Sequence, residues 1–456
     1  MTVFRWFPLL MIAVGCQAAD GADLSDSTSS GISVVVPDAA VLTPAGNEII
    51  RIQSHPRVAG AIDSLQWGGQ EFINSTDHGR QLQVAYVLDN RSECYNPTEA
   101  GSYHDDTGAS SSSVLRRYEA KGNVITSEAN PAFWLAPGTK HPAGDACAKA
   151  FNTTTVSRDV ISKRVEVGAL GLRHVIRFDT EVELSESHSA FQLEGATGYL
   201  RSDFTQLYAY DLATQGVTAL GSAPYGEQGG PVIVATASGA HAMGAWSPKP
   251  TDAATTLSYG RGYFGGPPDH ATSKWTVIFR RGATSAGTFR STVYIAVGSL
   301  ENVRVALRQT YDLVGPTGSG SAAAPSPAAA PGAVAPMYRG WNGRSHSFSL
   351  DAGQLAGAGF KNEGVGFYVS RGGSGAAQPI FQCHTGEYRF ISGDSLCEGF
   401  AYEGPLGYLF TNPGAGTGAL HRCTRGGDHL YTRDAAECVG DYLDEGVLGY
   451  APDGNR

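Results

Sequence analysis

The C-terminal part of this chain repeats itself three times, and no other feature restricts the possible folds as strongly. Each copy contains a Glu-Gly pair, at Glu363, Glu403 and Glu445, and then a glycine followed by an aromatic residue, as in Gly366–Phe367. The period is about 40 residues, which indicates one supersecondary unit used three times. A single unit cannot bury its own apolar face, so we expect the copies to pack on one another as a small α+β domain over residues 337–456.

The repeat also carries a recognisable motif. The third copy contains His429-Leu-Tyr-Thr432 followed by Glu437, and the first copy keeps His346. This pattern resembles a family of uncharacterised repeats in bacterial secreted proteins, with the signature His-x-Tyr-Thr, Glu, Gly-Tyr and Glu-Gly-x-x-Gly-Tyr. The second copy departs from the motif, since it has Glu387–Arg389 instead of that His-x-Tyr. The resemblance implies an accessory attachment module and no catalytic residue.

Residues 315–336 separate this repeat from a larger N-terminal body. The segment is rich in Pro and Ala, has no charge and no periodicity, and is typical of a semi-extended linker. Upstream, residues 41–314 contain many short stretches of β-branched and aromatic residues punctuated by turn clusters. His174–Leu184 alternates apolar and polar residues as a strand does, and only Leu300–Asp312 has a helical period. We therefore expect a mainly β protein whose first body is a large antiparallel sandwich or barrel.

One stretch of the first body resembles a known family. The order Ala61-Ile-Asp-Ser-Leu-Gln-Trp-Gly-Gly-Gln-Glu-Phe-Ile-Asn74, then Asp77-His-Gly-Arg-Gln-Leu-Gln83, is similar to the opening of the galactose-mutarotase-like super-sandwich. In that superfamily a strand with Gly-x-Glu leads to a Gly-Arg that lines the site, and members epimerise, cleave or bind sugars. The family's Asn-His-x-Tyr-Phe-Asn motif is absent from this sequence, which argues against mutarotase activity itself. The resemblance implies a large antiparallel β super-sandwich.

The densest group of polar residues lies in Thr76–Asp106. His78 and Arg80 are two residues apart, so we expect them on one strand face, continuous with apolar Leu82. An arginine on an apolar face needs a partner or a ligand, because a buried unpaired charge is costly. Sugar sites combine carboxylates, amides and aromatic rings. On this basis the candidate binding residues are His78, Arg80, Tyr95 and Asn96, and the candidate catalytic residues are Glu93, Glu99, His104 and Asp105.

A plainer interpretation of the same region is a surface loop, with Arg80 in an ion pair and His104 in solvent. A further loop, Tyr259–Trp275, borders a cleft or forms an ordinary long turn. The sequence contains no Gly-x-Ser-x-Gly, His-Glu-x-x-His, P-loop or dinucleotide-binding motif. It therefore leaves open whether any reaction is catalysed, and it predicts no cofactor.

The N-terminus is typical of an exported protein. Residues 1–15 carry Arg5, then an apolar stretch too short to span a bilayer, then small residues, as in a signal peptide. Val14-Gly15-Cys16 resembles the lipobox of bacterial lipoproteins, in which the cysteine is acylated. We expect residues 16–40 to form a flexible tether from a lipidated Cys16. The alternative is ordinary cleavage near Ala18, which would release the protein.

The six cysteines after Cys16 are expected to form three disulfides in an oxidising compartment. No Cys-x-x-Cys occurs, so no metal site is predicted. Copies two and three each contain two cysteines at near-equivalent places before Glu403 and Glu445, and copy one contains none. Cysteines gained together favour a bridge within each copy, closing loops of about 15 residues. The predicted pairs are Cys383–Cys397, Cys423–Cys438 and, in the first body, Cys94–Cys147.

The partner predicted from these observations is extracellular carbohydrate. The net charge is −10 and no basic run occurs, so nucleic acid is excluded as a partner. We expect a lipoprotein at the bacterial cell surface or outer membrane, otherwise secreted, that meets the membrane only through its lipid anchor. Its N-terminal β domain would bind or process a glycan, and the repeats would attach it. The alternative is a non-enzymatic adhesion or structural surface protein.

Overall fold

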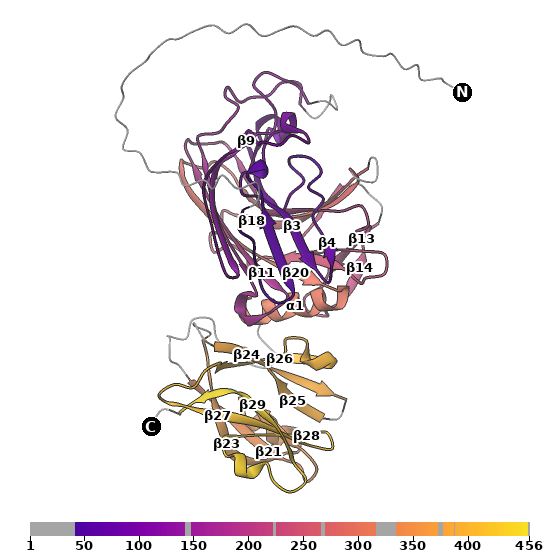
Figure 1. Ribbon diagram of the computed structural model, residues 1–456, viewed down its shortest axis with the longest axis vertical. Coiled ribbons are helices and arrows are strands. Elements are labelled where there is room, and N and C mark those ends of the chain that lie inside the picture. The colour runs from indigo at the N-terminus through magenta and orange to yellow at the C-terminus, as the bar shows by residue number, and fades with distance from the viewer. Residues whose placement is uncertain are drawn as a thin grey trace, which may run out of the picture. The chain divides into compact units, whose positions relative to one another are not determined.

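The computed structural model describes residues 42–141, 147–221, 225–265, 270–315, 334–372, 377–386 and 388–454. The expected signal peptide, Cys16, the tether and most of the linker lie outside these residues. The described part is mainly β, with several large antiparallel sheets, which confirms the predicted fold class. Figure 1 shows the first body from indigo to salmon and the repeat body from orange to yellow.

The first body is built from two large sheets and one small sheet. In spatial order the nine-stranded sheet contains β14 (Val217–Ala219), β13 (Gln206–Tyr210), β16 (Val232–Ala235), β17 (Ala242–Trp246), β20 (Gly287–Gly298), β11 (Val175–Leu184), β10 (Val160–Val167), β8 (Val124–Asn130) and β7 (Val114–Lys121). The seven-stranded sheet contains β15 (Tyr225–Gln228), β18 (Thr256–Phe264), β19 (Thr272–Arg281), β12 (Phe191–Leu200), β5 (Gln83–Leu88), β6 (Pro97–Thr98) and β9 (Ala132–Phe133). The small sheet contains β1 (Ala45–Gly46), β2 (Ile50–Ser54), β3 (Ile62–Trp67) and β4 (Gln70–Glu71).

Alternating burial explains why these segments form strands. Along β11 the apolar side chains of Val175, Phe178 and Val182 are fully buried, while the charged residues between them are partly or fully exposed. The corresponding apolar residues of β12 and β19, such as Leu193 and Val277, belong to the same core cluster. Each large sheet therefore contributes one apolar face to a shared core, as in a sandwich.

The helix α1 (Leu300–Val314) covers part of the nine-stranded sheet. Ser299 caps its N-terminus by accepting a hydrogen bond from the Asn302 amide, and the Asn302 side chain binds back to the Ser299 amide. The buried side of the helix includes Val303 and Leu307. A Cβ on Gly244 of β17 would lie 3.1 Å from both of those side chains, so glycine there permits the close approach.

The second body contains three copies of one unit, each made of a long strand, a short strand, a helical turn and a long strand. Copy one contains β21 (Val334–Trp341), β22 (His346–Ser349), α2 (Ala352–Gly357) and β23 (Lys361–Ser370). Copy two contains β24 (Ala377–Thr385), β25 (Tyr388–Ser392), the turn Cys397–Gly399 and β26 (Ala401–Phe410). Copy three contains β27 (Thr417–Arg425), β28 (Asp428–Thr432), the turn Ala435–Glu437 and β29 (Leu443–Pro452). The first strand, β21, begins inside the segment that the sequence suggested as linker.

The structure joins the cysteines in the three pairs expected from the sequence. The Cα atoms are 5.2 Å apart in Cys94–Cys147 and 5.6 Å apart in both Cys383–Cys397 and Cys423–Cys438. Three disulfides indicate an exported protein, because reduced compartments keep thiols free. Within the described ranges, no helix combines the length and the apolar character needed to cross a membrane.

Candidate functional site

His78 and Arg80 do not lie on a strand, because β5 begins only at Gln83. The expected shared strand face is therefore wrong. The His78 ring is fully buried, and its two nitrogens lie 2.7 Å from the backbone carbonyls of Asp106 and Arg57. Both nitrogens are used to hold two loops together, and neither points to a ligand.

Arg80 contacts the protein in two directions. Its Nε lies 2.8 Å from Oδ1 of Asp77, and its Nη1 donates to the carbonyl of His270. Burial raises the pKa of Asp77, while the charge of Arg80 opposes that rise. Asp77 is the ion-pair partner that the sequence required for Arg80. The hydrogen bond from Arg80 to the His270 carbonyl then ties the loop before β5 to the loop before β19.

Glu99 is buried in the first body, and the partly buried Asn96 is bound to a neighbouring strand. The Glu99 carboxylate forms a fully buried ion pair with Lys163, and its second oxygen accepts the Val84 amide at 3.0 Å. The Asn96 side chain donates to the Tyr86 carbonyl at 2.6 Å. A carboxylate with less than 2% of its side chain exposed cannot meet a polymeric substrate.

Asp105 and His104 lie in a short helical turn at Tyr103–Asp105. One Asp105 oxygen accepts hydrogen bonds from the Ser102 amide and from both the amide and the hydroxyl of Ser112, at 2.6–2.9 Å. It therefore organises the loop. The His104 ring is exposed and packs edge-on against Tyr103, with ring centroids 5.6 Å apart.

Glu93 and Tyr95 lie on the loop that the Cys94–Cys147 disulfide holds. Glu93 forms an ion pair with His141 at 2.7 Å. Tyr95 stacks on Phe133 with centroids 5.3 Å apart, and its hydroxyl donates to Glu186. Burial and the nearby Glu186 carboxylate raise the pKa of Tyr95 to about 12. The structure thus distributes the eight predicted residues over several local networks rather than one site.

A different group of polar residues comes together on the outer face of the seven-stranded sheet. The inward residues of β12 and β19 belong to the core, and the alternate residues point outward. Outward-facing Glu194 and Lys274 form an ion pair, with Nζ 3.0 and 2.9 Å from the two carboxylate oxygens. Their side chains are only 16% and 15% exposed. This pair places two opposite charges, each still reached by solvent, on an otherwise well-covered part of the sheet.

Aromatic rings border this ion pair. The Lys274 ammonium lies 5.1 Å from the centre of the Tyr199 ring. Phe264 lies 6.0 Å from Tyr199 and 5.4 Å from Tyr225, measured between ring centroids. The ring of Tyr225 is 61% exposed. We call these five residues, Glu194, Lys274, Tyr199, Phe264 and Tyr225, the sheet-face site.

Two glycines of β18 allow neighbouring side chains of this face to pack closely. In register across the sheet, Tyr225 pairs with Gly262, which pairs with Lys274, which pairs with Tyr199. Gly260 occupies the next outward position on β18. A Cβ there would lie 2.7 Å from Thr276, and one on Gly262 would lie 3.2 Å from Tyr225. Both glycines are themselves buried, so Thr276 and Tyr225 occupy the space beside them.

The electrostatics of the sheet-face site follow from its partial burial. Burial alone would lower the pKa of Lys274, but the Glu194 carboxylate outweighs it and raises the pKa. Burial raises the pKa of Tyr199, Lys274 opposes this, and the charges of Glu194 and Glu93 add to it. The site therefore offers an ammonium, a carboxylate and a neutral phenol. Glu93, one of the candidates predicted from the sequence, contributes to this rise in the pKa of Tyr199 through its charge.

Sequence reasoning missed Glu194 and Lys274. Both lie in segments expected to be strands or the loop before one, and Tyr259–Trp275 had been noted as a possible cleft border. Glu194 follows the apolar Leu193, but Lys274 lies between Ser273 and Trp275, so the local pattern does not single out either residue. No local signal relates residues 80 positions apart, so only the strand register could bring them together.

Comparisons with known proteins give weak resemblances in fold. No protein-family model matches this chain, and no curated protein sequence matches it. Heparan sulfate lyase HepC from Pedobacter heparinus is 10% identical over 58% of this chain and 37% of its own, with a TM-score of 0.31. A galactose mutarotase-like protein from Lactobacillus casei is 10% identical over 56% of this chain and 99% of its own, with a TM-score of 0.28. The galactosidase domain of an alpha-galactosidase-sucrose kinase is 10% identical over 59% and 42%, with a TM-score of 0.32.

Proposed function

We propose that this protein binds extracellular carbohydrate on the sheet-face site. The observation that carries the proposal is the partly covered Glu194–Lys274 ion pair, with the Tyr199 ring 5.1 Å from the ammonium. The exposed ring of Tyr225 lies two strands away on the same sheet. Sugars present hydroxyl pairs on one side and C–H groups on the other. An ammonium and a carboxylate suit the hydroxyls, and an aromatic face suits the C–H groups.

The site is built for binding rather than for a reaction. Glycoside hydrolysis requires two carboxyl groups on either side of the bond, about 5–10 Å apart. Among the five residues of the sheet-face site, Glu194 supplies the carboxylate, and Lys274 donates to both of its oxygens. Glu93 is the second acid whose charge reaches Tyr199, and His141 engages it. We therefore assign recognition, not catalysis, to this face.

A glycan array with the soluble protein lacking Cys16 tests the proposal. Tyr225→Ala should weaken binding of the selected glycan about 2- to 12-fold without loss of stability, because an aromatic contact contributes about 0.5–1.5 kcal/mol and this ring is exposed. Lys274→Met should abolish binding, and Lys121→Met, at an exposed position of β7, is the matched control. Absence of any glycan ligand, or equal binding by all three variants, would disprove the assignment.

We also propose that Cys16 is lipidated and that the repeats serve as an accessory attachment module. The three disulfides support export, and the Val14-Gly15-Cys16 sequence supports an anchor. In a bacterial host, Cys16→Ser should move the protein from the membrane fraction to the soluble fraction and remove palmitate labelling. Retention of the mutant in the membrane fraction would contradict the anchor.

A further inference from the structure

Strand register defines equivalent positions in the three copies of the repeat. Arg339 in copy one lies opposite Gly364, Gln382 in copy two lies opposite Gly404, and Arg422 in copy three lies opposite Gly446. Each of those glycines follows the repeated glutamate. Two copies therefore carry an arginine at a position where copy two carries a glutamine.

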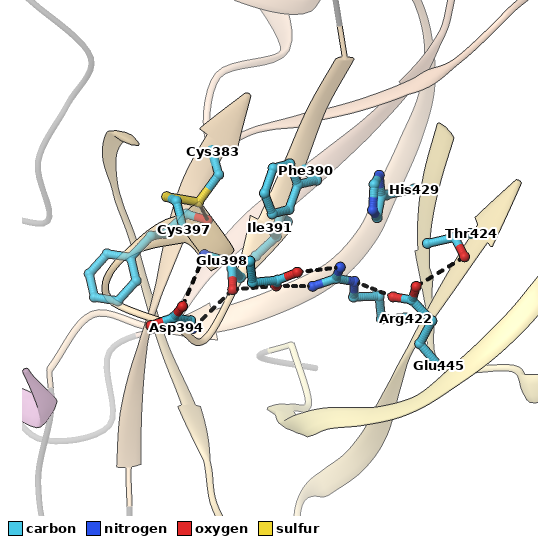
Figure 2. A network of polar contacts seen from close by, with 12 residues as sticks. Cys383, Phe390, Ile391, Asp394, Cys397, Glu398, Arg422, Thr424, His429 and Glu445 are labelled. Atoms are coloured by element: carbon cyan, nitrogen blue, oxygen red, sulfur yellow. Dashed lines mark hydrogen bonds and ion pairs between the residues drawn. A yellow bond between two sulfur atoms is a disulfide. The ribbon is translucent and has the colours of Figure 1, made fainter. Parts of the chain in front are cut away.

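Arg422 closes the junction between copies two and three. Its Nε lies 2.6 Å from Glu445 of its own copy, and its Nη2 lies 2.9 Å from Glu398 of copy two. The guanidinium also covers the Phe390 ring of copy two at 5.5 Å, and the side chain is only 14% exposed. Figure 2 shows Arg422 between the two carboxylates, with Thr424 bonded to Glu445 on the far side.

Arg339 closes the junction between copies three and one in the same way. It lies 3.0 Å from Glu363 of its own copy and 2.9 Å from Glu437 in the helical turn of copy three. Two of the three junctions are thus filled by one arginine between two acids, one from each copy.

The junction between copies one and two lacks this filling. Gln382 replaces the arginine, and Glu403 is engaged by Arg389 at 2.7 and 3.1 Å instead. The helix α2 of copy one contains no acidic residue, since its sequence is Ala-Gly-Gln-Leu-Ala-Gly. It therefore has no counterpart of Glu398 or Glu437, which bind the arginine of the next copy. A cavity of about 540 Å³ occupies the place of the missing side chains. Such a volume is within the range of about 300–1,000 Å³ common for small-molecule sites.

Arg371 lines this cavity without a partner for its charge. Within the described residues, its Nη1 is buried and has no hydrogen-bond partner. Desolvation lowers the pKa of Arg371. The acids of the cavity are already used, since Asp351 caps α2 through the Gly353 amide and Glu403 binds Arg389. The Arg371 side chain is half-buried, and its covered Nη1 has no partner among the described residues. An unsatisfied covered donor is costly, and a ligand carboxylate would remove that cost.

The other walls of the cavity suit a hydroxylated ring. Ser347, Gln354 and Gln382 provide hydroxyl and amide groups, which both donate and accept. Phe348 and Leu406 provide apolar surface. We propose that the junction between copies one and two binds a sugar acid, with its carboxylate on Arg371 and its hydroxyls on these polar groups. The site belongs to the repeat body and does not depend on the sheet-face site.

Calorimetric titration of the full chain with glucuronate, glucose and N-acetylglutamate tests the proposal. We expect glucuronate to bind and the other two to bind much more weakly, since one lacks the carboxylate and the other the hydroxylated ring. Arg371→Gln should reduce glucuronate affinity about 10- to 100-fold, the range expected when a hydrogen bond to a charged group is lost. Gln382→Arg should abolish binding, because it restores the side chain that fills the other two junctions.

Arg433→Gln is the matched control, since Arg433 pairs with Asp453 away from the cavity and should leave glucuronate affinity unchanged. Unchanged glucuronate affinity in both Arg371→Gln and Gln382→Arg would overturn the proposal. So would stronger binding of N-acetylglutamate than of glucuronate, or no binding of glucuronate by the wild type. Loss of neutral-glycan binding in Lys274→Met with glucuronate binding retained would separate this site from the sheet-face site.

Discussion

The ion pair of Glu99 and Lys163 makes the first body sensitive to a single substitution. Both side chains are fully buried between the sheets. Lys163 also donates to the Gly60 carbonyl at 2.8 Å, and Glu99 accepts the Val84 amide at 3.0 Å. Lys163→Met keeps most of the side-chain volume but leaves a carboxylate in the core with one backbone donor. Because removing one partner of a buried pair leaves an uncompensated charge, we expect a loss of about 3–5 kcal/mol.

The double variant Glu99→Met/Lys163→Met gives the matching control. It removes both charges and leaves the Gly60 carbonyl and the Val84 amide unpaired, at about 1–3 kcal/mol each. Its cost should therefore be less than the sum of the two single costs, by as much as about 3 kcal/mol for residues in contact.

Urea unfolding followed by tryptophan fluorescence measures these values, because Trp67, Trp134, Trp246 and Trp275 all lie in the first body. Lys121→Met should change stability by less than about 0.5 kcal/mol, as surface substitutions do. A loss below about 1 kcal/mol for Lys163→Met, or strictly additive single and double values, would refute the reasoning. Glu99 would then be free to act in a site, as the sequence had suggested.

Two further predictions concern the repeat body. Burial alone would raise the pKa of Asp428, but hydrogen bonds from His346 and Tyr442 outweigh it and lower the pKa. A lowered carboxyl pKa stabilises the fold above the unfolded value of 3.8, and that contribution disappears as the pH falls through the folded value. The variant Asp428→Asn should therefore lack the loss of stability that the wild type shows below pH 4. Identical acid-unfolding curves for the two proteins would exclude this contribution of Asp428. Arg422→Gln introduces the residue of copy two and removes the ion pairs with Glu398 and Glu445. It should cost about 1–2 kcal/mol in thermal unfolding, because both carboxylates are about a third exposed and Glu445 keeps its hydrogen bond from Thr424. A neutral effect would show that the junction needs no arginine.

The fold class and the three-copy repeat could be predicted because they depend on local patterns. Alternation over His174–Leu184 predicted the strand β11, and the period of Leu300–Asp312 predicted α1. The repeat placed Cys383 and Cys397 at positions equivalent to Cys423 and Cys438, so the pairing within each copy followed from symmetry. Short-range spacing is enough for each of these inferences.

The polar residues could not be assigned in the same way. Arg80, Glu99 and Asp105 have the chemistry of a sugar site, but each is satisfied by a partner that the sequence does not identify. Glu194 and Lys274 carry no local signal and meet only because β12 and β19 pair with a bulge between them.

The sequence by itself determined that this is an exported type of β protein with a three-copy repeat, because strand alternation, repeat period and cysteine spacing are properties of neighbouring residues. Only the tertiary structure decided which charged groups are buried in pairs, which remain open on the sheet face, and which of the three repeat junctions is left unfilled. The physical reason is that the cost of burying a charge depends on partners brought together by strand register over long separations, and sequence patterns do not record that register.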